Sequence, residues 1–167
     1  MNMTHRTPLA AQARADTPLG PILLAATEGG LAGLWFEGQK HHPGDLDAPV
    51  DASQRWIAQA LAELPAYWQS GKTVFRVSLD PQGSDFQRAV WAALQRIATG
   101  TTASYGALAA SLGRASAVRA VAAAIGRNPV SVIVPCHRVL GATGALTGYA
   151  GGIERKAALL RLEGALF

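Results

Sequence analysis

The sequence predicts an α+β protein in two parts: a small sheet with one helix, followed by a helical region. Two short apolar segments, residues 19–27 and 31–37, flank Glu28-Gly29-Gly30, which is the pattern of a β-hairpin. After residue 83 the apolar residues recur at helical spacing instead. A turn cluster at residues 80–83 separates the two patterns. We therefore expect one domain over residues 16–82 and a second over residues 83–167.

The first domain should add one helix and one further strand to the hairpin. Apolar residues at helical spacing predict a helix over residues 53–64, which Pro65 should end or kink. Residues 73–79 alternate between polar and apolar, which predicts a half-buried strand. Residues 1–15 lack a continuous apolar core, so we interpret them as a disordered tail and not as a signal peptide.

The second domain has the start and stop signals of three helices. Ser84 and Gln87 have the spacing of a capping box. Ser104 can cap a short helix that runs to Leu112, and Ser116 can cap another over residues 117–125. Two short helices joined by a glycine-containing turn are typical of a helix-turn-helix motif. The pattern alone favours an ordinary pair of packed helices, so both interpretations stay open.

Charge is distributed unevenly between the two domains. Residues 1–82 contain six Lys/Arg and eight Asp/Glu, a net charge of −2, whereas residues 83–167 contain nine and three, a net charge of +6. Basic charge gathered in one region indicates a polyanion partner, most simply nucleic acid. The helix over residues 117–125 consists almost entirely of small residues, with Arg119 as its one long side chain. Arg119 is therefore either a plain surface charge or a group that reaches into such a partner.

Cys136 is the single cysteine of the chain, and His137 and Arg138 follow it directly. A thiol beside a base and a cation is the arrangement that activates a cysteine as a nucleophile. A buried structural cysteine is the alternative, because cysteine is among the most buried residue types. Polar residues interrupt the apolar segment at this point, which favours the reactive interpretation.

The sequence offers neither a disulfide nor a metal site. One cysteine excludes an intramolecular disulfide and indicates a reducing compartment, so we expect a cytoplasmic protein. A zinc site needs further thiols or suitably spaced histidines. His41 and His42 are adjacent, and Pro43 and Gly44 after them indicate a solvated loop. No segment reaches transmembrane length.

Six short motifs in the second half of the chain occur in a recognisable order. They are Ser104-Tyr105-Gly106, Arg119-Ala120-Val121, Asn128-Pro129, Pro135-Cys136-His137-Arg138, Tyr149-Ala150-Gly151-Gly152 and Glu163-Gly164. Together they resemble the methylated-DNA–protein-cysteine methyltransferases, or O6-alkylguanine-DNA alkyltransferases, of the bacterial constitutive type. The resemblance is dense over residues 84–167 and looser over residues 16–82. It implies a ribonuclease-H-like N-terminal domain and a C-terminal domain of winged-helix type.

The resemblance implies direct-reversal DNA repair. Cys136 would take an alkyl group from O6 of guanine, or more slowly from O4 of thymine, after the nucleotide is flipped out of the duplex. Glu163 would orient His137, which would draw the thiol proton through a water. Tyr105 would push the phosphate during flipping and hydrogen-bond the leaving base. Asn128 would brace the turn before the active-site segment.

The resemblance also assigns DNA contacts and a substrate pocket. Arg119 would fill the space that the flipped nucleotide leaves in the duplex. The other DNA contacts would come from Ser104, Tyr105, Ala117, Ala120 and Arg138. The pocket would be formed by Val139, Tyr149, Ala150, Gly151 and Lys156, with the Ala150 amide near the base oxygen and the Val139 carbonyl near the exocyclic amine. Some relatives have serine where this chain has Ala150.

The chemistry of the cysteine agrees with this assignment. Sulfur that displaces a methyl group forms a thioether, which water does not hydrolyse, so each molecule should react once. The target oxygen lies within the base stack, so extrusion of the nucleotide is required. We expect a monomer acting on double-stranded DNA, with no cofactor, metal or membrane. Two alternatives are a lesion-binding protein without catalysis, against which Cys136 argues, and a Cys-His-Glu hydrolase, which would have no use for Arg119.

Overall fold

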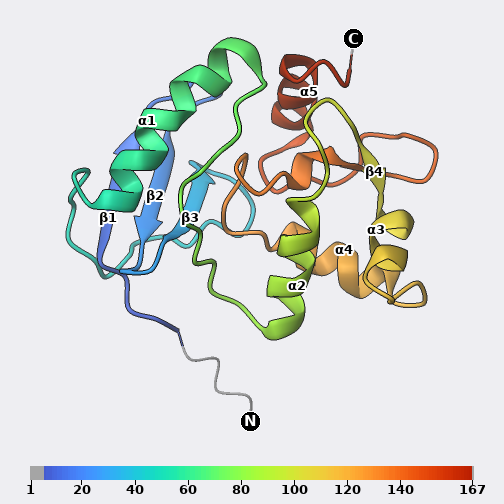
Figure 1. Cartoon of the computed structure of the whole chain (residues 1–167), viewed down its shortest axis with the longest axis horizontal. Helices are drawn as coiled ribbons and strands as arrows, with labels where there is room; N and C mark the ends of the chain where they lie inside the picture. Colours follow the sequence, from blue (N-terminus) through green and yellow to red (C-terminus); the bar gives the residue numbers. More distant parts are fainter. Residues whose placement is uncertain (1–5, 167) are drawn as a thin grey trace.

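The computed structural model describes residues 6–166. Figure 1 shows two regions side by side, a sheet with one covering helix and a group of helices. The mixed α+β class is therefore confirmed. The first region contains β1 (Ala11–Ala15), β2 (Ile22–Ala26), β3 (Leu31–Phe36) and α1 (Arg55–Ser70). The second contains α2 (Asp85–Leu94), β4 (Ala103–Ser104), α3 (Tyr105–Ser111), α4 (Val118–Gly126), a 3₁₀ turn (Cys136–Arg138), β5 (Val139–Leu140) and α5 (Ile153–Leu162).

The sheet is antiparallel with strand order β1-β2-β3, and the predicted hairpin forms its β2 and β3. Strand β1 corrects the prediction of a disordered tail over residues 1–15, because residues 11–15 pair with β2. Ala11 and Ala13 are buried in this strand. Alanines make a weak apolar alternation, which is why the strand could not be seen in the sequence. Residues 1–5 of the predicted tail lie outside the described residues.

Helix α1 is longer than the sequence indicated: of the two predicted effects of Pro65, an end or a kink, the end is wrong, because the helix continues to Ser70. The Gln54 side chain caps the helix start, and Gly71 ends it with a left-handed backbone (φ 67°). Pro65 lies inside the helix on its exposed face. Leu64 and Tyr67, on either side of it, are buried. Packing of this apolar face against the sheet therefore outweighs the local cost of proline, about 3 kcal/mol.

Residues 73–79 do not form the predicted strand. They meet the sheet at one isolated bridge, where the Leu31 amide donates to the Ser78 carbonyl at 2.7 Å. The amides of Arg76 and Val77 donate instead to Oε1 of Glu63 in α1, at 2.9 and 3.2 Å. A long-range carboxylate therefore replaces the strand partner that the alternating pattern predicted.

The helical region follows its local signals closely. The capping box of α2 is present, with both the Ser84 and the Gln87 side chains bonded as predicted. Ser104 caps α3 through a 3.0 Å bond from the Ala107 amide. Ser116 does not cap α4, which begins after Ala117 without a side-chain cap. Helix α4 packs on both α2 and α3, and the Trp91 indole donates to the Ala124 carbonyl at 2.8 Å.

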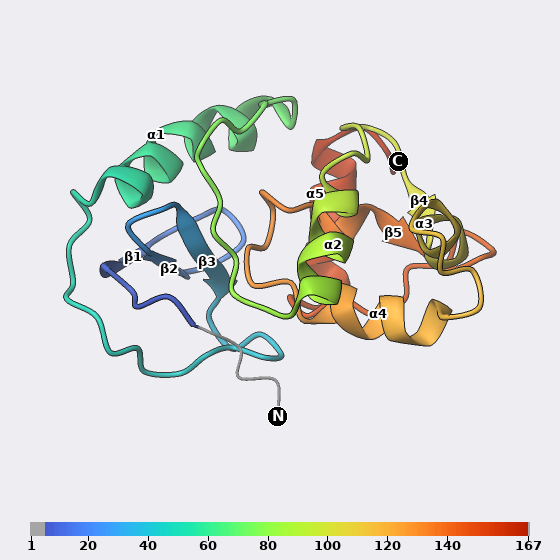
Figure 2. The same ribbon diagram turned by 60° about the horizontal axis from the view of Figure 1, so that its bottom comes forward.

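The two regions share one hydrophobic core, which fixes the segment before Cys136 against the sheet. The Leu34 amide of β3 donates to the Pro129 carbonyl at 2.8 Å, and the Ser131 amide donates back to the Leu34 carbonyl at 2.9 Å. Strands β4 and β5 then pair in parallel, so the start of α3 lies beside the end of the Cys136 turn (Figure 2).

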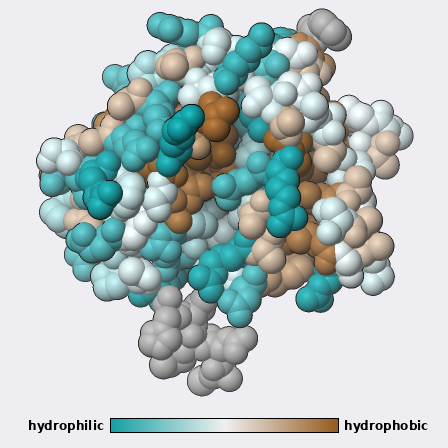
Figure 3. Space-filling view, in the orientation of Figure 1, coloured by the Kyte–Doolittle hydropathy of each residue, from teal (hydrophilic) through white to brown (hydrophobic). Residues whose placement is uncertain are grey.

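On the face shown in Figure 3, apolar patches lie over both regions, and polar side chains lie between them. A groove of about 590 Å³ runs between the segment at residues 73–79 and the loop at residues 95–99. Within residues 6–166, no helix combines the length and apolar character needed to cross a membrane.

Candidate active site

Cys136 lies at the first position of the 3₁₀ turn, almost fully buried, and borders a cavity of about 370 Å³. Asn128 holds the segment that leads to it. The Asn128 amide nitrogen donates to the Val134 carbonyl at 2.9 Å and to the Cys136 Sγ at 3.1 Å. The Asn128 oxygen accepts from the Val130 amide at 3.0 Å. This geometry agrees with the bracing role expected for Asn128 and adds a direct bond to the sulfur.

His137 and Glu163 form the polar centre of the buried cluster, which we define as Tyr67, Cys136, His137, Arg138 and Glu163. His137 Nε2 lies 2.8 Å from Glu163 Oε2. The Arg138 guanidinium donates to both carboxylate oxygens, at 2.8 Å from Nε to Oε1 and 3.0 Å from Nη2 to Oε2. The Tyr67 hydroxyl donates to Oε2 at 2.6 Å. Four donor atoms thus surround one buried carboxylate.

The protonation states of the cluster follow from these contacts. Burial alone would raise the pKa of Glu163, but the hydrogen bonds from His137, Arg138 and Tyr67 outweigh it and lower the pKa to about 2. Burial, helped by Arg138 and Lys156, lowers the pKa of His137 despite the carboxylate beside it. Glu163 is therefore ionised and His137 neutral at pH 7. Nε2 then carries the proton, which it donates to Glu163, and Nδ1 carries the free lone pair.

The thiol of Cys136 is protonated at rest. Burial raises its pKa to about 11, although the Asn128 bond and the Lys156 charge act in the opposite direction. Adjacent basic residues in the sequence are thus not sufficient to produce a thiolate here, because the sulfur is buried. A base must remove the proton when the reaction occurs. Among the described residues, His137 Nδ1 is buried and without a hydrogen-bond partner, so its lone pair is available.

The cavity beside Cys136 is lined by α3, α4 and the loop at residues 144–152. Its walls include Tyr105, Ala122, Ile125, Tyr149 and Ala150. Tyr149 is the second buried polar group without a partner in the described chain, at its hydroxyl. Gly151 is buried at the end of the same loop.

Two cations, the buried Lys156 and the partly exposed Arg155, hold that loop in place. Lys156 Nζ donates to the carbonyls of Val139 at 2.5 Å, Thr147 at 2.7 Å and Gly148 at 3.3 Å. The Val139 carbonyl, expected to face the base, therefore already accepts a bond from Lys156. Burial lowers the pKa of Lys156 to about 8.

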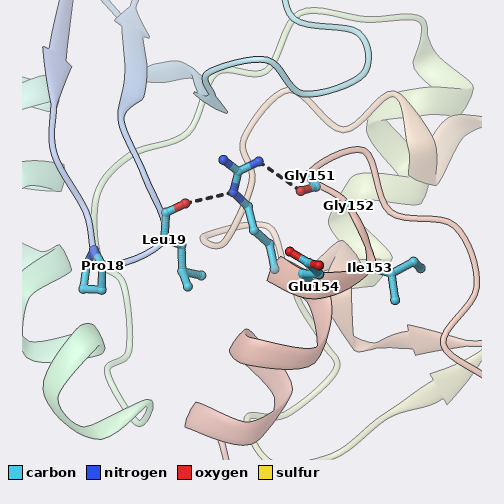
Figure 4. A pocket seen from close by; sticks show the side chains of 7 residues that line it. Pro18, Leu19, Gly151, Gly152, Ile153 and Glu154 are labelled. Carbon is cyan, nitrogen blue, oxygen red and sulfur yellow. Dashed lines mark hydrogen bonds between the residues drawn. The ribbon is translucent and has the colours of Figure 1, made fainter.

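Arg155 supplies the second tie, between the loop and the first region of the chain. Its Nε donates to the Leu19 carbonyl at 2.9 Å and its Nη1 to the Gly151 carbonyl at 3.1 Å. Figure 4 shows Leu19 and Gly151 facing each other across this bridge. The loop is thus fixed at several backbone carbonyls.

Lys40 and His41 also line the cavity, a position that the sequence did not reveal. The Lys40 amide donates to the Ala150 carbonyl at 2.9 Å, and His41 has a left-handed backbone (φ 61°). His41 is exposed, as a solvated loop predicts, yet it borders the reactive pocket. His41 reaches the pocket through a contact between segments that are distant in the sequence, and no sequence motif predicts such a contact.

The predicted DNA contacts divide into two groups. Arg119 and Ala120 are exposed on α4, and Ser104, Tyr105 and Ala117 are partly exposed nearby. The Tyr105 hydroxyl donates to the Thr147 carbonyl at 3.2 Å. Arg138 does not fit its predicted DNA contact, because it is 8% exposed and donates to the Ile97 carbonyl and Thr99 hydroxyl as well as to Glu163. Residue type alone could not distinguish it from a surface arginine.

No group of three or more histidine, cysteine or acidic side chains within residues 6–166 lies close enough together to hold a metal ion.

Comparison with known proteins identifies the family. The profile described as "6-O-methylguanine DNA methyltransferase, ribonuclease-like domain" matches residues 12–81, and the corresponding "DNA binding domain" profile matches residues 85–165. A methylated-DNA–protein-cysteine methyltransferase of Mycolicibacterium paratuberculosis is 45% identical over 148 residues, covering 89% of this chain and 88% of the relative. One from Methanosarcina acetivorans is 44% identical, covering 89% and 95%.

Solved structures agree with this relationship. The Mycobacterium tuberculosis OGT in complex with DNA has 43% identity and a TM-score of 0.81, covering 93% of this chain and 94% of the other. Its fold therefore matches both regions of this protein. From the buried thiol, the paired histidine and glutamate, and these matches, we conclude that the chain belongs to the family of methylated-DNA–protein-cysteine methyltransferases.

Proposed function

We propose that this protein repairs alkylated DNA by direct reversal, with Cys136 as the acceptor of the alkyl group. The substrates are O6-alkylguanine and, more slowly, O4-methylthymine in double-stranded DNA. The single observation that carries the assignment of roles is the free Nδ1 lone pair of His137 beside a buried, protonated thiol. The ionised Glu163 bonded to the opposite ring nitrogen stabilises the imidazolium that forms when His137 accepts a proton.

The reaction begins with proton transfer from Cys136 to His137. No direct hydrogen bond joins the two side chains in the described part of the chain, so we assign the transfer to one water that bridges the sulfur and Nδ1. The sulfur then attacks the alkyl carbon, an S–C bond forms and the C–O6 bond breaks. The electron pair of that bond stays on guanine, which takes up a proton and becomes neutral. The thioether has no route back to the thiol, so each protein molecule reacts once.

Burial of Cys136 makes nucleotide flipping necessary. A base within a duplex cannot reach a sulfur that lies at the bottom of a recessed pocket, so the damaged nucleotide must rotate into that pocket. Arg119 is exposed on α4, where it can enter the duplex and occupy the space left behind. The small residues of α4 permit a close approach to the DNA. Tyr105 lines the pocket and contacts the flipped nucleotide.

The loop at residues 144–152 supplies the far wall of the substrate pocket. Ala150 has no hydroxyl, so its backbone amide is the donor that stabilises the developing charge on the base oxygen. Lys156 and Arg155 keep this loop fixed before the substrate arrives. We further propose that the protein is a monomer in the cytoplasm, where a reducing environment keeps its one cysteine in the thiol form.

Intact-protein mass spectrometry tests the proposal. The protein is incubated with a duplex oligonucleotide that contains O6-methylguanine, and a matched duplex with unmodified guanine serves as control. We expect one methyl group in place of the thiol hydrogen, on the peptide that contains Cys136. Cys136→Ala should gain no mass yet bind the duplex with unchanged affinity. Absence of mass gain in the wild-type protein would overturn the proposal, and catalytic turnover without modification would indicate the hydrolase alternative.

A further inference from the structure

Tyr67 is the one member of the buried cluster that comes from the first region of the chain. It lies on α1, is 1% exposed, and donates to Glu163 Oε2 at 2.6 Å across a separation of 96 residues. Its ring packs against Trp68 and Phe75, with centroids 5.2 and 5.5 Å away. Burial and the neighbouring carboxylate raise the pKa of Tyr67, so its hydroxyl stays protonated and can act only as a donor to Glu163.

Tyr67 and His137 use the same carboxylate oxygen. Oε2 of Glu163 accepts from His137 at 2.8 Å as well as from Tyr67. Arg138 bonds both oxygens at once and therefore fixes the orientation of the carboxylate without help from Tyr67. The Tyr67 hydroxyl therefore acts on the charge of the carboxylate and not on its orientation. A donor on Oε2 disperses negative charge that would otherwise act on the imidazole.

We propose that Tyr67 is a positioning residue of the reaction: by donating to the oxygen shared with His137, it limits the pull of Glu163 on the ring proton and keeps the imidazole neutral, able to accept the thiol proton. This inference rests on the proposed function, because it concerns the base in that reaction. It also gives the first region of the chain a direct part in chemistry that occurs in the second.

The direction of the effect follows from the groups around His137. Arg138 and Lys156 oppose protonation of the imidazole and Glu163 favours it. Cys136 precedes His137 in the sequence, and Tyr149 is close enough to Cys136 and Glu163 for their charges to act on its hydroxyl. When the Tyr67 hydroxyl is removed, the full charge of Oε2 acts on His137, and the imidazole holds its proton to higher pH. A larger fraction of the protein then has a protonated His137, which cannot act as a base.

The decisive experiment is the pH profile of alkyl transfer in Tyr67→Phe. The rate is measured with free O6-benzylguanine, within the range where circular dichroism shows a folded protein. We expect the acidic limb of the profile to move up by about 0.5–1 pH unit, with less than about threefold change on the plateau. Coincident profiles would overturn the inference. Trp68→Phe is the matched control: it disturbs packing on the same ring and leaves Glu163 untouched, so stability should fall while the limb stays in place.

If Tyr67→Phe folds poorly, a substitution that changes only the donor strength of the hydroxyl provides a second, independent test. A fluorinated tyrosine placed at position 67 alone is a stronger donor of nearly the same shape, and it should move the acidic limb to lower pH. NMR titration of the His137 ring nitrogens should follow both shifts in the same order. Shifts of one sign for both variants, or none, would contradict the inference.

The wild-type protein separates this inference from the proposed function. If wild-type Cys136 gains no alkyl group from O6-benzylguanine or from the methylated duplex, the proposed function itself fails. If it does gain the group and the Tyr67 variants show an unmoved acidic limb, only the role of Tyr67 fails.

Discussion

Two arginines of the second region, Arg119 and Arg138, have opposite environments. Arg138 is buried and donates to Glu163, Ile97 and Thr99. Arg119 is exposed on α4, and its side chain makes no hydrogen bond or ion pair within residues 6–166. The difference separates two requirements of the same protein. Chemistry needs charges that are fixed and paired before the substrate arrives, whereas DNA recognition needs a group that is free until the duplex supplies its partner.

This contrast predicts how the two regions respond to mutation. Loss of the Glu163 carboxylate from the buried cluster should reduce both the free energy of unfolding and the reactivity toward any substrate, because the same bonds serve both. Changes on α4 should leave stability and free-base chemistry nearly unchanged and slow only the reaction in duplex DNA.

Glu163→Gln should give the largest effect. The amide cannot accept from all four donor atoms, and Arg138 is left without its buried counter-charge. We expect a loss of roughly 3–5 kcal/mol in the free energy of unfolding and a fall of about 100-fold or more in transfer to Cys136. Urea denaturation and the rate with free O6-benzylguanine measure these. Glu154→Gln, an exposed acid in the first turn of α5, the helix that ends just before Glu163, is the control and should cost less than about 1 kcal/mol.

Lowering the pH should weaken the buried cluster, and we expect no such effect on α4. The pKa of Glu163 is about 2 in the folded protein and 4.5 as the ordinary value. A lowered folded pKa contributes stability that is complete above about pH 4.5 and is lost as the pH falls toward 2. The amount is on the order of 3 kcal/mol at 1.36 kcal/mol per pKa unit.

The gap in unfolding free energy between the wild-type protein and Glu163→Gln should therefore narrow across that pH range. Urea denaturation at a series of pH values measures it. A gap that stays constant would show that Glu163 stabilises the fold without its charge.

Arg119→Ala tests the other side of the comparison. In the proposed mechanism Arg119 fills the space left by the flipped nucleotide, and flipping costs a few kcal/mol. Loss of the side chain would leave that cost without compensation. We expect repair in duplex DNA to slow by about tenfold or more, whereas reaction with free O6-benzylguanine and the unfolding free energy remain unchanged. Arg127→Ala is the control, since it removes the same charge from an exposed position just after α4. Equal slowing on both substrates would place Arg119 in the pocket instead.

Local signals in the sequence were sufficient for the parts of the fold that depend on neighbouring residues. The Ser84–Gln87 capping box and the Ser104 cap form as predicted because their bonds span three residues. Pro65 was misjudged because the contacts that keep α1 intact lie on the sheet. The strand predicted over residues 73–79 failed because Glu63 takes two of its amides.

The same distinction applies to the site. The motif around Cys136 predicted a nucleophile, and this residue lines the pocket, while Glu163 lies beside His137 as the resemblance implied. Tyr67, Lys40 and His41 could not be found, because each reaches the site through tertiary contacts and has no recognisable neighbours in sequence. Burial also decided the resting state of Cys136, and burial of a single side chain is not readable from a sequence motif.

Mutations that alter the substrate range should have the smallest effect. They test whether the pocket itself is rigid, like the buried cluster. The cavity beside Cys136 has a volume of about 370 Å³ and includes Ala122, Gly148 and Ala150 among its walls. Small side chains leave room near the alkyl group, so ethyl and larger O6 adducts should be accepted with a modest loss of rate. The loop is held at its carbonyls by Lys156 and by the Lys40 amide, so the room comes from missing side chains and not from movement of the loop.

Ala150→Leu should therefore narrow the range more than it slows the basic reaction. We expect transfer of a benzyl group to fall by about tenfold relative to transfer of a methyl group, which corresponds to about 1.4 kcal/mol of steric conflict. Ala142→Leu, at an exposed position before the loop, is the control and should alter neither rate. Competition among methyl, ethyl, propyl and benzyl adducts in one duplex, measured by intact-protein mass, gives the order. If the rate of the wild-type protein falls sharply between the methyl and the ethyl adduct, the pocket is tight. The small residues then serve close packing of the backbone, and the pocket is as rigidly held as the buried cluster.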